Sequence, residues 1–254
     1  MLKGKKGVVL GVANRRSIAW AVAKAASEAG AEVALTYQNE RLEKSVRGLA
    51  ETLPGKTVLI PCDVADDAQV AAFGDAVGEE MGMIDFLVHS IAYAHPDELR
   101  GEFHTTSREG FRKALETSVH SFIAIANAAD PFLREGGSLV TLSYIGSVRI
   151  IPNYNLMGVA KAALEATMRY LSYDLGARNI RANAVSAGPI KTLSASGIGD
   201  FQRILAHVEE MSPLRRNVDA DEVADAVCFL LSERARAITG TVLYVDAGYH
   251  AMGL

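Results

Sequence analysis

The sequence predicts one α/β domain built on a doubly wound parallel sheet, and two observations lead to that fold class. Short apolar runs rich in β-branched residues alternate with helical stretches of ten residues or more from residue 7 to residue 245. Strands separated by such helices are joined by right-handed crossovers, so they run parallel and are covered on both faces. No linker, repeat or low-complexity segment interrupts the 254 residues. We therefore expect a single domain over residues 1–254.

Each element follows from a local pattern. The first strand passes through a tight loop into a helix for which Ser17 is a suitable N-cap. A Gly-Gly turn precedes the strand at 137–143, and the pattern becomes irregular after Gly188-Pro189. We expect a polar loop at 92–107 and a partly helical insertion at 191–217. The expected strands are 7–12, 32–37, 56–61, 84–89, 137–143, 180–185 and 240–245, and the expected helices are 18–29, 39–53, 66–81, 108–133, 154–177 and 219–232.

Composition and charge bear on several functional classes. With 49% hydrophobic and 22% charged residues the chain can bury a large core, and a net charge of −4 gives no basic footprint for nucleic acid. Cys62 and Cys228 lie far apart in apolar segments, so we expect free buried thiols. The six histidines lack metal-ligand spacing, and no signal peptide or membrane-length apolar run is present. We expect no metal, no nucleic acid, no membrane and a cytoplasmic location.

The most distinctive residues fall where such a sheet binds its ligands, beyond the carboxyl ends of its strands. A random scatter of turn residues would not place all of them along one edge. In chain order they are Gly11 and Ser17, Gln38, Asp63, Ser90 to Ala92, Tyr144, and Gly188 to Ile190.

The loop after the first strand departs from the usual G-x-G-x-x-G fingerprint of dinucleotide-binding sites, because Gly11 is the only glycine of the three that is present. Ser17 and the helix start are suited to a pyrophosphate, since helix N-termini favour anions; an ordinary capped turn is the alternative. The second strand ends at Gln38, where a dinucleotide site usually carries an acidic residue. Asp63 suits an adenine amino group, or else it caps a solvated loop.

Tyr154 and Lys161 form a second feature, seven residues apart in the helix expected at 154–177. Seven residues fall only about 20° short of two full turns, so phenol and ammonium share one face near the helix start. A neighbouring ammonium favours phenolate and is expected to bring the phenol pKa down from near 10 toward the working range. Beside a nicotinamide, the Lys suits a ribose hydroxyl and the phenol suits the oxygen on which charge builds during hydride transfer. A surface Tyr and a surface Lys are the alternative.

Several segments together match one family. Tyr154 and Lys161 in this βαβ frame resemble the short-chain dehydrogenases/reductases, whose ordinary members carry Tyr-x3-Lys with a Ser thirteen residues before the Tyr. In that register Met157 stands at the ordinary Tyr position and Tyr144 at the ordinary Ser position. This departure resembles bacterial enoyl-acyl-carrier-protein reductase of the NADH-linked type. The likeness covers essentially the whole chain and is also carried by residues 11–19, 36–40, 89–92 and 192–201.

The resemblance implies a Rossmann-type fold and NADH-dependent reduction of the C2=C3 double bond of trans-2-enoyl thioesters in fatty-acid elongation. It assigns Tyr154 to the thioester carbonyl, Lys161 to the nicotinamide ribose and Tyr144 to the flank of the substrate, and it implies a homotetramer. Segment 191–217 would form a mobile substrate-binding flap. The resemblance places Gly11, Ser17, Ile18, Gln38, Asp63, Val64, Ser90, Ala92, Lys161, Ile190 and Thr192 at the NADH site, and Ala92, Tyr144, Tyr154 and Arg203 at the substrate.

The cofactor is expected to be NADH rather than NADPH, because a 2′-phosphate needs a cation beside the end of the second strand. Gln38 and Asn39 stand there, followed by Glu40, which would repel the phosphate. Arg41 is the one feature that favours NADPH.

The protein partner implied by the resemblance is an acyl carrier protein, which is strongly acidic and should dock on a basic surface. The resemblance places that surface beside the flap, where Arg203 is the remaining cation and Gly199 and Gln202 hold positions expected to be basic. Arg215 and Arg216 lie just downstream and either supply the missing charge or serve the cofactor side or a subunit contact.

Two other functions are compatible with a dinucleotide fold. A carbonyl reductase of the same superfamily is disfavoured because the Ser-Tyr-x3-Lys register is missing. A catalytically silent sensor or scaffold is disfavoured because Tyr154 and Lys161 are both present.

Overall fold

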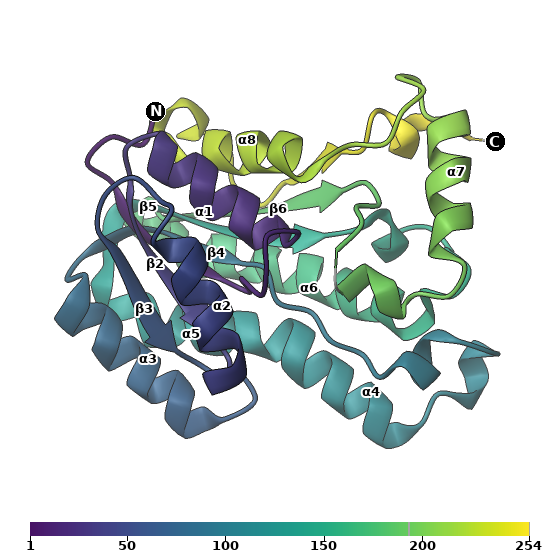
Figure 1. Cartoon of the computed structure of the whole chain (residues 1–254), viewed down its shortest axis with the longest axis horizontal. Helices are drawn as coiled ribbons and strands as arrows, with labels where there is room; N and C mark the ends of the chain where they lie inside the picture. Colours follow the sequence, from purple (N-terminus) through teal and green to yellow (C-terminus); the bar gives the residue numbers. More distant parts are fainter. Residues whose placement is uncertain (193, 254) are drawn as a thin grey trace.

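The computed structural model describes residues 1–192 and 194–253, which form one seven-stranded parallel sheet with helices on both faces (Figure 1). The strands are β1 (Lys6–Leu10), β2 (Glu32–Tyr37), β3 (Thr57–Pro61), β4 (Ile84–His89), β5 (Leu133–Ser143), β6 (Arg181–Ala187) and β7 (Val242–Val245). Their order, β3-β2-β1-β4-β5-β6-β7, confirms the doubly wound topology predicted from the sequence. The strand order reverses between β1 and β4, where sheets of this kind bind their ligands.

Two layers of helices enclose the sheet. The helices are α1 (Ile18–Glu28), α2 (Glu40–Ala50), α3 (Asp67–Glu80), α4 (Arg108–Leu115), α5 (Ser121–Ala129), α6 (Asn155–Asp174), α7 (Phe201–Met211) and α8 (Ala220–Leu231). Helices α1, α2 and α8 contribute to one hydrophobic core, and α3, α5 and α6 contribute to the other. Side chains of Asn39, Asp66 and Asp219 cap α2, α3 and α8, which explains why these helices begin where the sequence predicted.

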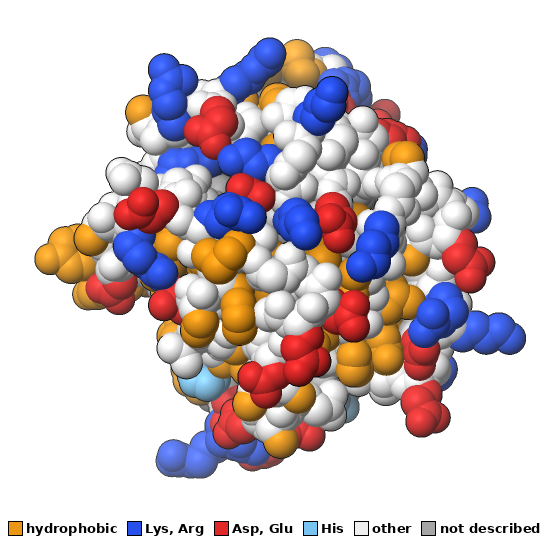
Figure 2. Space-filling view, turned by 90° about the vertical axis from the view of Figure 1, so that its left-hand side faces the viewer, with side chains coloured by type: hydrophobic (Ala, Val, Ile, Leu, Met, Phe, Trp, Pro, Cys, Tyr) orange, Lys and Arg blue, Asp and Glu red, His pale blue; other side chains and the backbone are white. Residues whose placement is uncertain are grey.

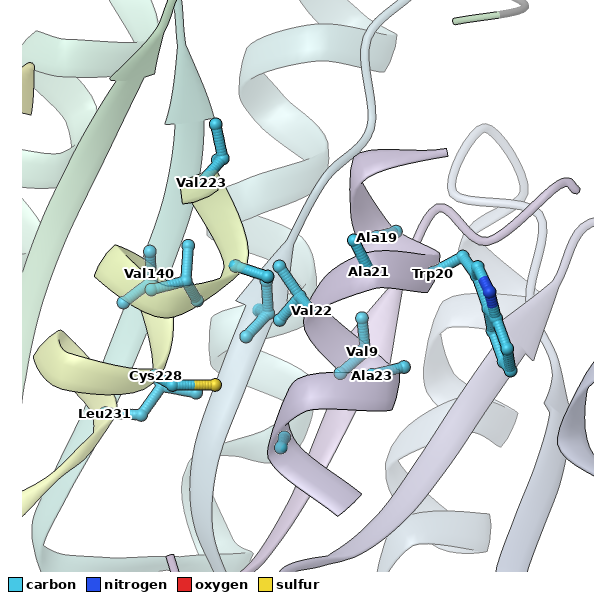
Figure 3. Packing of buried hydrophobic residues seen from close by; sticks show 14 of the residues in the cluster. Val9, Ala19, Trp20, Ala21, Val22, Ala23, Val140, Val223, Cys228 and Leu231 are labelled. Carbon is cyan, nitrogen blue, oxygen red and sulfur yellow. The ribbon is translucent and has the colours of Figure 1, made fainter. Parts of the chain in front are cut away.

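Small side chains bring α1 close to α8. Ala19, Val22 and Ala23 of α1 are fully buried. Figure 3 shows the two helices side by side, and Val22, Cys228 of α8 and Val140 of β5 belong to one buried cluster. Full burial of a valine-sized side chain stabilises the fold by roughly 1.5–3 kcal/mol, so this contact fixes α1, and with it the loop that precedes α1, against the sheet.

The helix predicted at 108–133 is wrong at its end. Helix α5 ends at Ala129, and a short 3-10 turn containing Pro131 follows. A proline lacks the N–H that a continuing helix needs. Strand β5 then begins at Leu133, which pairs with Ile84 before an irregularity in the ladder. The strand is therefore longer at its amino end than the Gly-Gly turn suggested.

The same predicted helix is also interrupted within its length. A π turn at Glu116–His120 separates α4 from α5. The Ser118 hydroxyl in this turn accepts from Tyr93 N at 2.9 Å and donates to Tyr93 O at 3.1 Å. π turns are frequent at functional sites, and this one ties the helix to the loop that follows β4.

The insertion at 191–217 is partly helical, as predicted. It contains a 3-10 turn at Ser194–Gly197 and then α7. Leu193 lies outside the described residues. Figure 1 shows α7 standing at one end of the molecule, beyond the carboxyl ends of the strands.

Ion pairs lie at the opposite end of the sheet, where the strands begin. Lys5 contacts Asp85 at 3.4 Å and Glu233 at 2.9 Å, and Lys6 contacts Glu32 at 3.4 Å. Figure 2 shows the face on the side away from α7, where cationic and anionic side chains are mixed. None of the helices in the described residues combines the length and the hydrophobicity that a membrane-spanning segment requires.

Candidate active site

A cavity of about 440 Å³ lies beyond the carboxyl ends of β1, β4, β5 and β6. Its position is the one expected for a ligand in a doubly wound sheet. The structure brings ten of the predicted residues together in its lining, namely Gly11, Ser17, Ile18, Ser90, Ala92, Tyr144, Tyr154, Lys161, Ile190 and Thr192.

Tyr144 and Tyr154 meet inside this cavity. Their rings lie edge to face with centroids 4.9 Å apart and an interplanar angle of 71°. Tyr154 stands at the N-cap of α6 and is 8% exposed. A Cβ on Gly146 would lie 2.5 Å from the Tyr154 ring, so the glycine makes room for the phenol. The loop after β5 therefore packs directly against the start of α6 and sets the position of both rings.

Lys161 lies on the cavity-facing side of α6 and is 6% exposed. Its Nζ donates a hydrogen bond to Leu142 O at 2.7 Å. An ammonium carries three donors, so this bond to β5 leaves donors for a ligand. The predicted grouping of the Tyr154 phenol and the Lys161 ammonium is thus present in one cavity.

The expected lowering of the Tyr154 pKa is wrong. Burial raises the pKa of this phenol, and the neighbouring Tyr144 phenol raises it further. Burial likewise raises the pKa of Tyr144, and it lowers the pKa of Lys161 to about 8, against an opposing effect of Glu165. Desolvation is the largest cause of both shifts, so both phenols are protonated at neutral pH.

His89, at the end of β4, is fully buried and uncharged in this site. Its ring nitrogens contact Thr141 Oγ1 at 3.1 Å and Ser121 Oγ at 2.9 Å. Burial lowers the pKa of His89 to about 3, and the charge of Lys161 adds to that effect. The histidine therefore joins β4, β5 and α5 as a neutral group.

The β1–α1 loop shows a close backbone approach and an unexpected use of Ser17. Gly11 has φ +95°, and a Cβ there would lie 2.1 Å from Ser90 O. Ser17 occupies the N-cap position as predicted, but its side chain does not cap the helix. Instead its Oγ accepts hydrogen bonds from Ala13 N and Asn14 N, both at 3.1 Å. The hydroxyl thus orders the loop in front of the helix N-terminus.

Gln38, Asp63 and Val64 lie outside the cavity lining, at the ends of β2 and β3. Gln38 Nε2 donates to Asp63 Oδ2 at 3.1 Å, so the structure brings these two predicted residues together. Asp63 Oδ1 also accepts from Ala65 N at 3.1 Å, which is the loop-capping contact weighed as an alternative. Val64 is partly buried against the core beneath them.

The cations considered for other roles lie away from the cavity. Arg41 lines a separate shallow hollow together with Arg15, Arg16 and Lys44. Arg216 pairs with Glu222 at 2.6 Å. Arg203 is exposed on α7, and α7 contributes Phe201 and Ile204 to the cavity wall instead.

Sequence reasoning missed the apolar wall of the cavity. Leu99 is only 5% exposed although it lies in the segment expected to be a polar loop. Apolar residues within that loop and in the insertion were the available signal, but loops lack the periodicity that reveals a buried face. The wall is formed by Tyr93, Pro96, Leu99, Met157, Ala195, Ile198, Phe201 and Ile204.

No group of three or more His, Cys, Asp and Glu side chains positioned for a metal occurs in the described part of the chain. Cys62 and Cys228 are free and buried.

The chain matches one family model and many curated proteins along its length. The model described as Enoyl-(Acyl carrier protein) reductase matches residues 11–250. Enoyl-[acyl-carrier-protein] reductase [NADH] 1 of Rhizobium meliloti is 52% identical over 254 residues, which is 100% of this chain and 93% of the relative. Enoyl-[acyl-carrier-protein] reductase [NADH] FabI of Bacillus subtilis is 50% identical over 98% of this chain and 97% of the relative.

Solved structures agree with these matches. The Bacillus cereus enoyl-acyl carrier protein reductase, solved with NADP+ and indole naphthyridinone, superposes with a TM-score of 0.98 at 50% identity, covering 100% of this chain and 99% of that one. The enoyl-(acyl-carrier-protein) reductase of Anaplasma phagocytophilum, solved with NAD, gives a TM-score of 0.94 at 46% identity, covering 100% and 94% of the two chains.

Proposed function

The chain belongs to the enoyl-(acyl carrier protein) reductase family, and on that premise we propose that Tyr144, Tyr154 and Lys161 form its catalytic centre. The protein is an oxidoreductase that uses NADH to reduce the C2=C3 double bond of trans-2-enoyl thioesters. The observation that carries the residue assignment is the meeting of the buried Tyr154 phenol, the partly buried Tyr144 phenol and the buried Lys161 ammonium in a single cavity.

The cofactor end of the cavity fits a dinucleotide. Gly11 lets the loop after β1 approach the Ser90 main chain closely, because a Cβ there would lie 2.1 Å from Ser90 O. Helix α1 begins at the cavity edge with N–H groups that an α-helix leaves unpaired. When bound, NADH supplies the hydride. Lys161 would donate to its ribose, and Gln38 and Asp63, which are already hydrogen-bonded to each other, would bind its adenosine end. The remaining residues proposed to hold it are Gly11, Ser17, Ile18, Val64, Ser90, Ala92, Ile190 and Thr192.

The phenols act on the substrate oxygen. Because burial raises the pKa of both Tyr144 and Tyr154, each keeps its proton at neutral pH. Tyr154 stabilises the thioester oxygen by hydrogen bonding or by proton donation as negative charge builds there during reduction. A preorganised donor of this kind is worth about 3 kcal/mol in a site from which water is excluded. Tyr144, packed against it, flanks the substrate together with Ala92.

The activity is tested by following NADH absorbance with a crotonyl or longer enoyl thioester and, in parallel, with a 3-ketoacyl thioester. Oxidation with the enoyl substrate alone supports the assignment. Turnover of the 3-ketoacyl substrate alone would indicate a carbonyl reductase, and absence of turnover with either would indicate a binding protein.

Segment 191–217 is proposed as a substrate-binding flap within the single domain. The support comes from its described part, in which Ala195, Ile198, Phe201 and Ile204 turn apolar side chains to the cavity. These residues offer an apolar surface for the acyl chain, and movement of the segment would open the cavity to it.

The acyl carrier protein is the proposed partner, with Arg203 as its main docking contact. Arg203 is exposed on α7, and of the two cations downstream, Arg216 is already paired with Glu222. The guanidinium of Arg215 donates to the main-chain oxygen of Glu210. Apart from Arg203, Lys191 is the exposed cation of the described segment that makes no such contact, so electrostatic steering of the acidic carrier protein is expected to be weak.

Replacing Arg203 with Glu is expected to raise the Michaelis constant for enoyl-carrier-protein about tenfold at low salt, and to raise that for enoyl-coenzyme A much less. The difference should shrink as salt screens the contact. Steady-state kinetics at two ionic strengths measure it, with Arg236→Glu, an exposed arginine after α8, as the control. Equal effects on both substrates at both salt concentrations would place the docking surface elsewhere.

We also propose that the protein forms a homotetramer and is located in the cytoplasm. Apolar side chains exposed on α6 and the loop before it, with Tyr170 at 75%, Tyr173 at 83% and Ile150 at 97%, offer a surface that other copies would cover. Two free cysteines suit a reducing compartment.

A further inference from the structure

A buried carboxylate lies one helical turn beyond Lys161. Glu165 of α6 is only 5% exposed. Its Oε1 accepts a hydrogen bond of 2.5 Å from Ser143 Oγ, and Ser143 directly precedes Tyr144 at the end of β5. Burying a carboxylate is costly unless it is hydrogen-bonded and balanced by charge. We therefore consider whether Glu165 acts on the neighbouring Lys161.

The contact belongs to a pair that joins α6 to β5. Lys161 Nζ donates to Leu142 O at 2.7 Å, and the next strand residue, Ser143, donates to Glu165. Leu142 and Ser143 both line the cavity. Two successive strand residues are thus held by two residues one turn apart on the helix, which fixes the strand end that leads into Tyr144.

Glu165 is also the anion that acts on the charge of Lys161. Burial lowers the pKa of Lys161 to about 8, while Glu165 acts in the opposite direction. The other titratable groups that face the lysine in the described structure are neutral at working pH. They are His89 from β4, whose pKa burial lowers to about 3, and the phenols Tyr144 and Tyr154, whose pKa values burial raises.

On the far side, Glu165 faces Tyr244 of β7. The carboxylate adds to the burial that raises the pKa of that phenol. The Tyr244 ring stacks on His250 with centroids 4.3 Å apart, and His250 Nδ1 lies 2.9 Å from Asp246 Oδ1. Arg149, exposed in the loop before α6, acts on the pKa of the Tyr244 phenol in the opposite direction. It is the cation on this far side, whereas Lys161 is the cation in the described cavity lining.

We propose that Glu165 is a positioning residue that keeps the Lys161 side chain charged and anchored to the end of β5. The proposal rests on the catalytic role given to Lys161 above. Glu165 is not among the residues that line the cavity; it acts through Lys161 by charge and through Ser143 by a hydrogen bond.

The direction of the effect follows from the sign of the charge. Without the carboxylate, nothing opposes the lowering of the Lys161 pKa by burial, so the ammonium loses its proton at a lower pH. As the pH rises, activity that needs the ammonium is therefore lost at a lower pH in the variant than in the wild type. A purely structural role would lower activity equally at every pH and leave the profile's shape unchanged.

Glu165→Gln is the test variant, because the amide keeps the size and an oxygen that can accept from Ser143. The alkaline limb of kcat/KM with crotonyl thioester is expected to move about one pH unit lower. Glu165→Asp keeps the charge, so its alkaline limb should lie close to that of the wild type. If the amide variant folds poorly, an alkaline limb displaced as far in Glu165→Asp would contradict the proposal. Glu28→Gln, an exposed glutamate at the end of α1, is the control and should leave the profile unchanged.

A second measurement uses the protein without cofactor or substrate. Trace acetylation by acetic anhydride, quantified at Lys161 by mass spectrometry across pH, reports the fraction of neutral amine. A one-unit fall from a pKa of about 8 gives about a fivefold rise in the neutral fraction at pH 7 in Glu165→Gln. An unchanged labelling midpoint and an unchanged pH profile in the folded variant would overturn the proposal.

The labelling also separates this inference from the proposed function. If Lys161→Ala kept full activity, the catalytic assignment would fail. The labelling midpoint of Lys161 would still report whether Glu165 sets its charge. A shifted midpoint with an unshifted activity profile would overturn the claim that the charge serves catalysis.

Discussion

Replacing Lys161 with Ala should reduce kcat/KM by roughly a thousandfold and weaken NADH binding at least about tenfold. One ammonium is assigned to the nicotinamide ribose and to the field around the phenols, so both properties should fall together. Its removal also leaves Leu142 O without its 2.7 Å donor and Glu165 without the neighbouring cation. Titration calorimetry with NADH and single-turnover kinetics measure the two effects separately.

Two further variants test whether the loss is specific to the ammonium of Lys161. Lys161→Arg should recover little, because a planar guanidinium does not replace a compact ammonium in a buried position. Lys24→Ala, at an exposed position of α1, should behave as wild type. Unchanged turnover in Lys161→Ala would remove the lysine from the mechanism.

Replacing Tyr154 with Phe is expected to slow reduction by about ten- to a thousandfold, the worth of one transition-state hydrogen bond. The fold should persist, because the ring belongs to the buried cluster beneath the cavity and stays in place. Tyr144 lies 4.9 Å away between ring centroids and can partly compensate. The double Phe variant should therefore be slower than either single variant, as measured by single turnover with crotonyl thioester.

The matched control for the phenols is Tyr170→Phe, on the same helix but outside the cavity lining, on the surface proposed for contacts between copies. It should keep the rate. Wild-type rates in Tyr154→Phe and in the double variant would mean that neither phenol takes part in the reaction.

The sequence was sufficient for those features that depend on local pattern. Strand β2 lies where its apolar run was found, and the capping side chains Asn39, Asp66 and Asp219 fix three helix starts. Because a parallel sheet gathers its strand ends along one edge, the position of Gly11, Ser90, Tyr144 and Ile190 around one cavity also followed.

Features that depend on depth or on tertiary contacts were not accessible in this way. The direction of the Tyr154 pKa shift depends on how completely the phenol is desolvated, which residue spacing does not reveal. Leu99 lies in a segment without periodicity, so its apolar side chain alone could not reveal that it is buried in the cavity wall. The helix predicted at 108–133 looked continuous because the contact that accompanies its break, between Ser118 and Tyr93, joins residues 25 positions apart.

The π turn at Glu116–His120 has a consequence for how the chain length can vary in evolution. A π turn contains one residue more than an α-helical turn, so deleting a single residue there would produce an uninterrupted helix. Because the turn takes up the extra residue, the positions that follow would keep their faces, so Ser121 would still reach His89 and Phe122 would stay in the core. The deletion would instead change the turn that holds Ser118 against Tyr93. We expect natural variants that lack one residue here to keep the helix and to lose this link to the loop after β4.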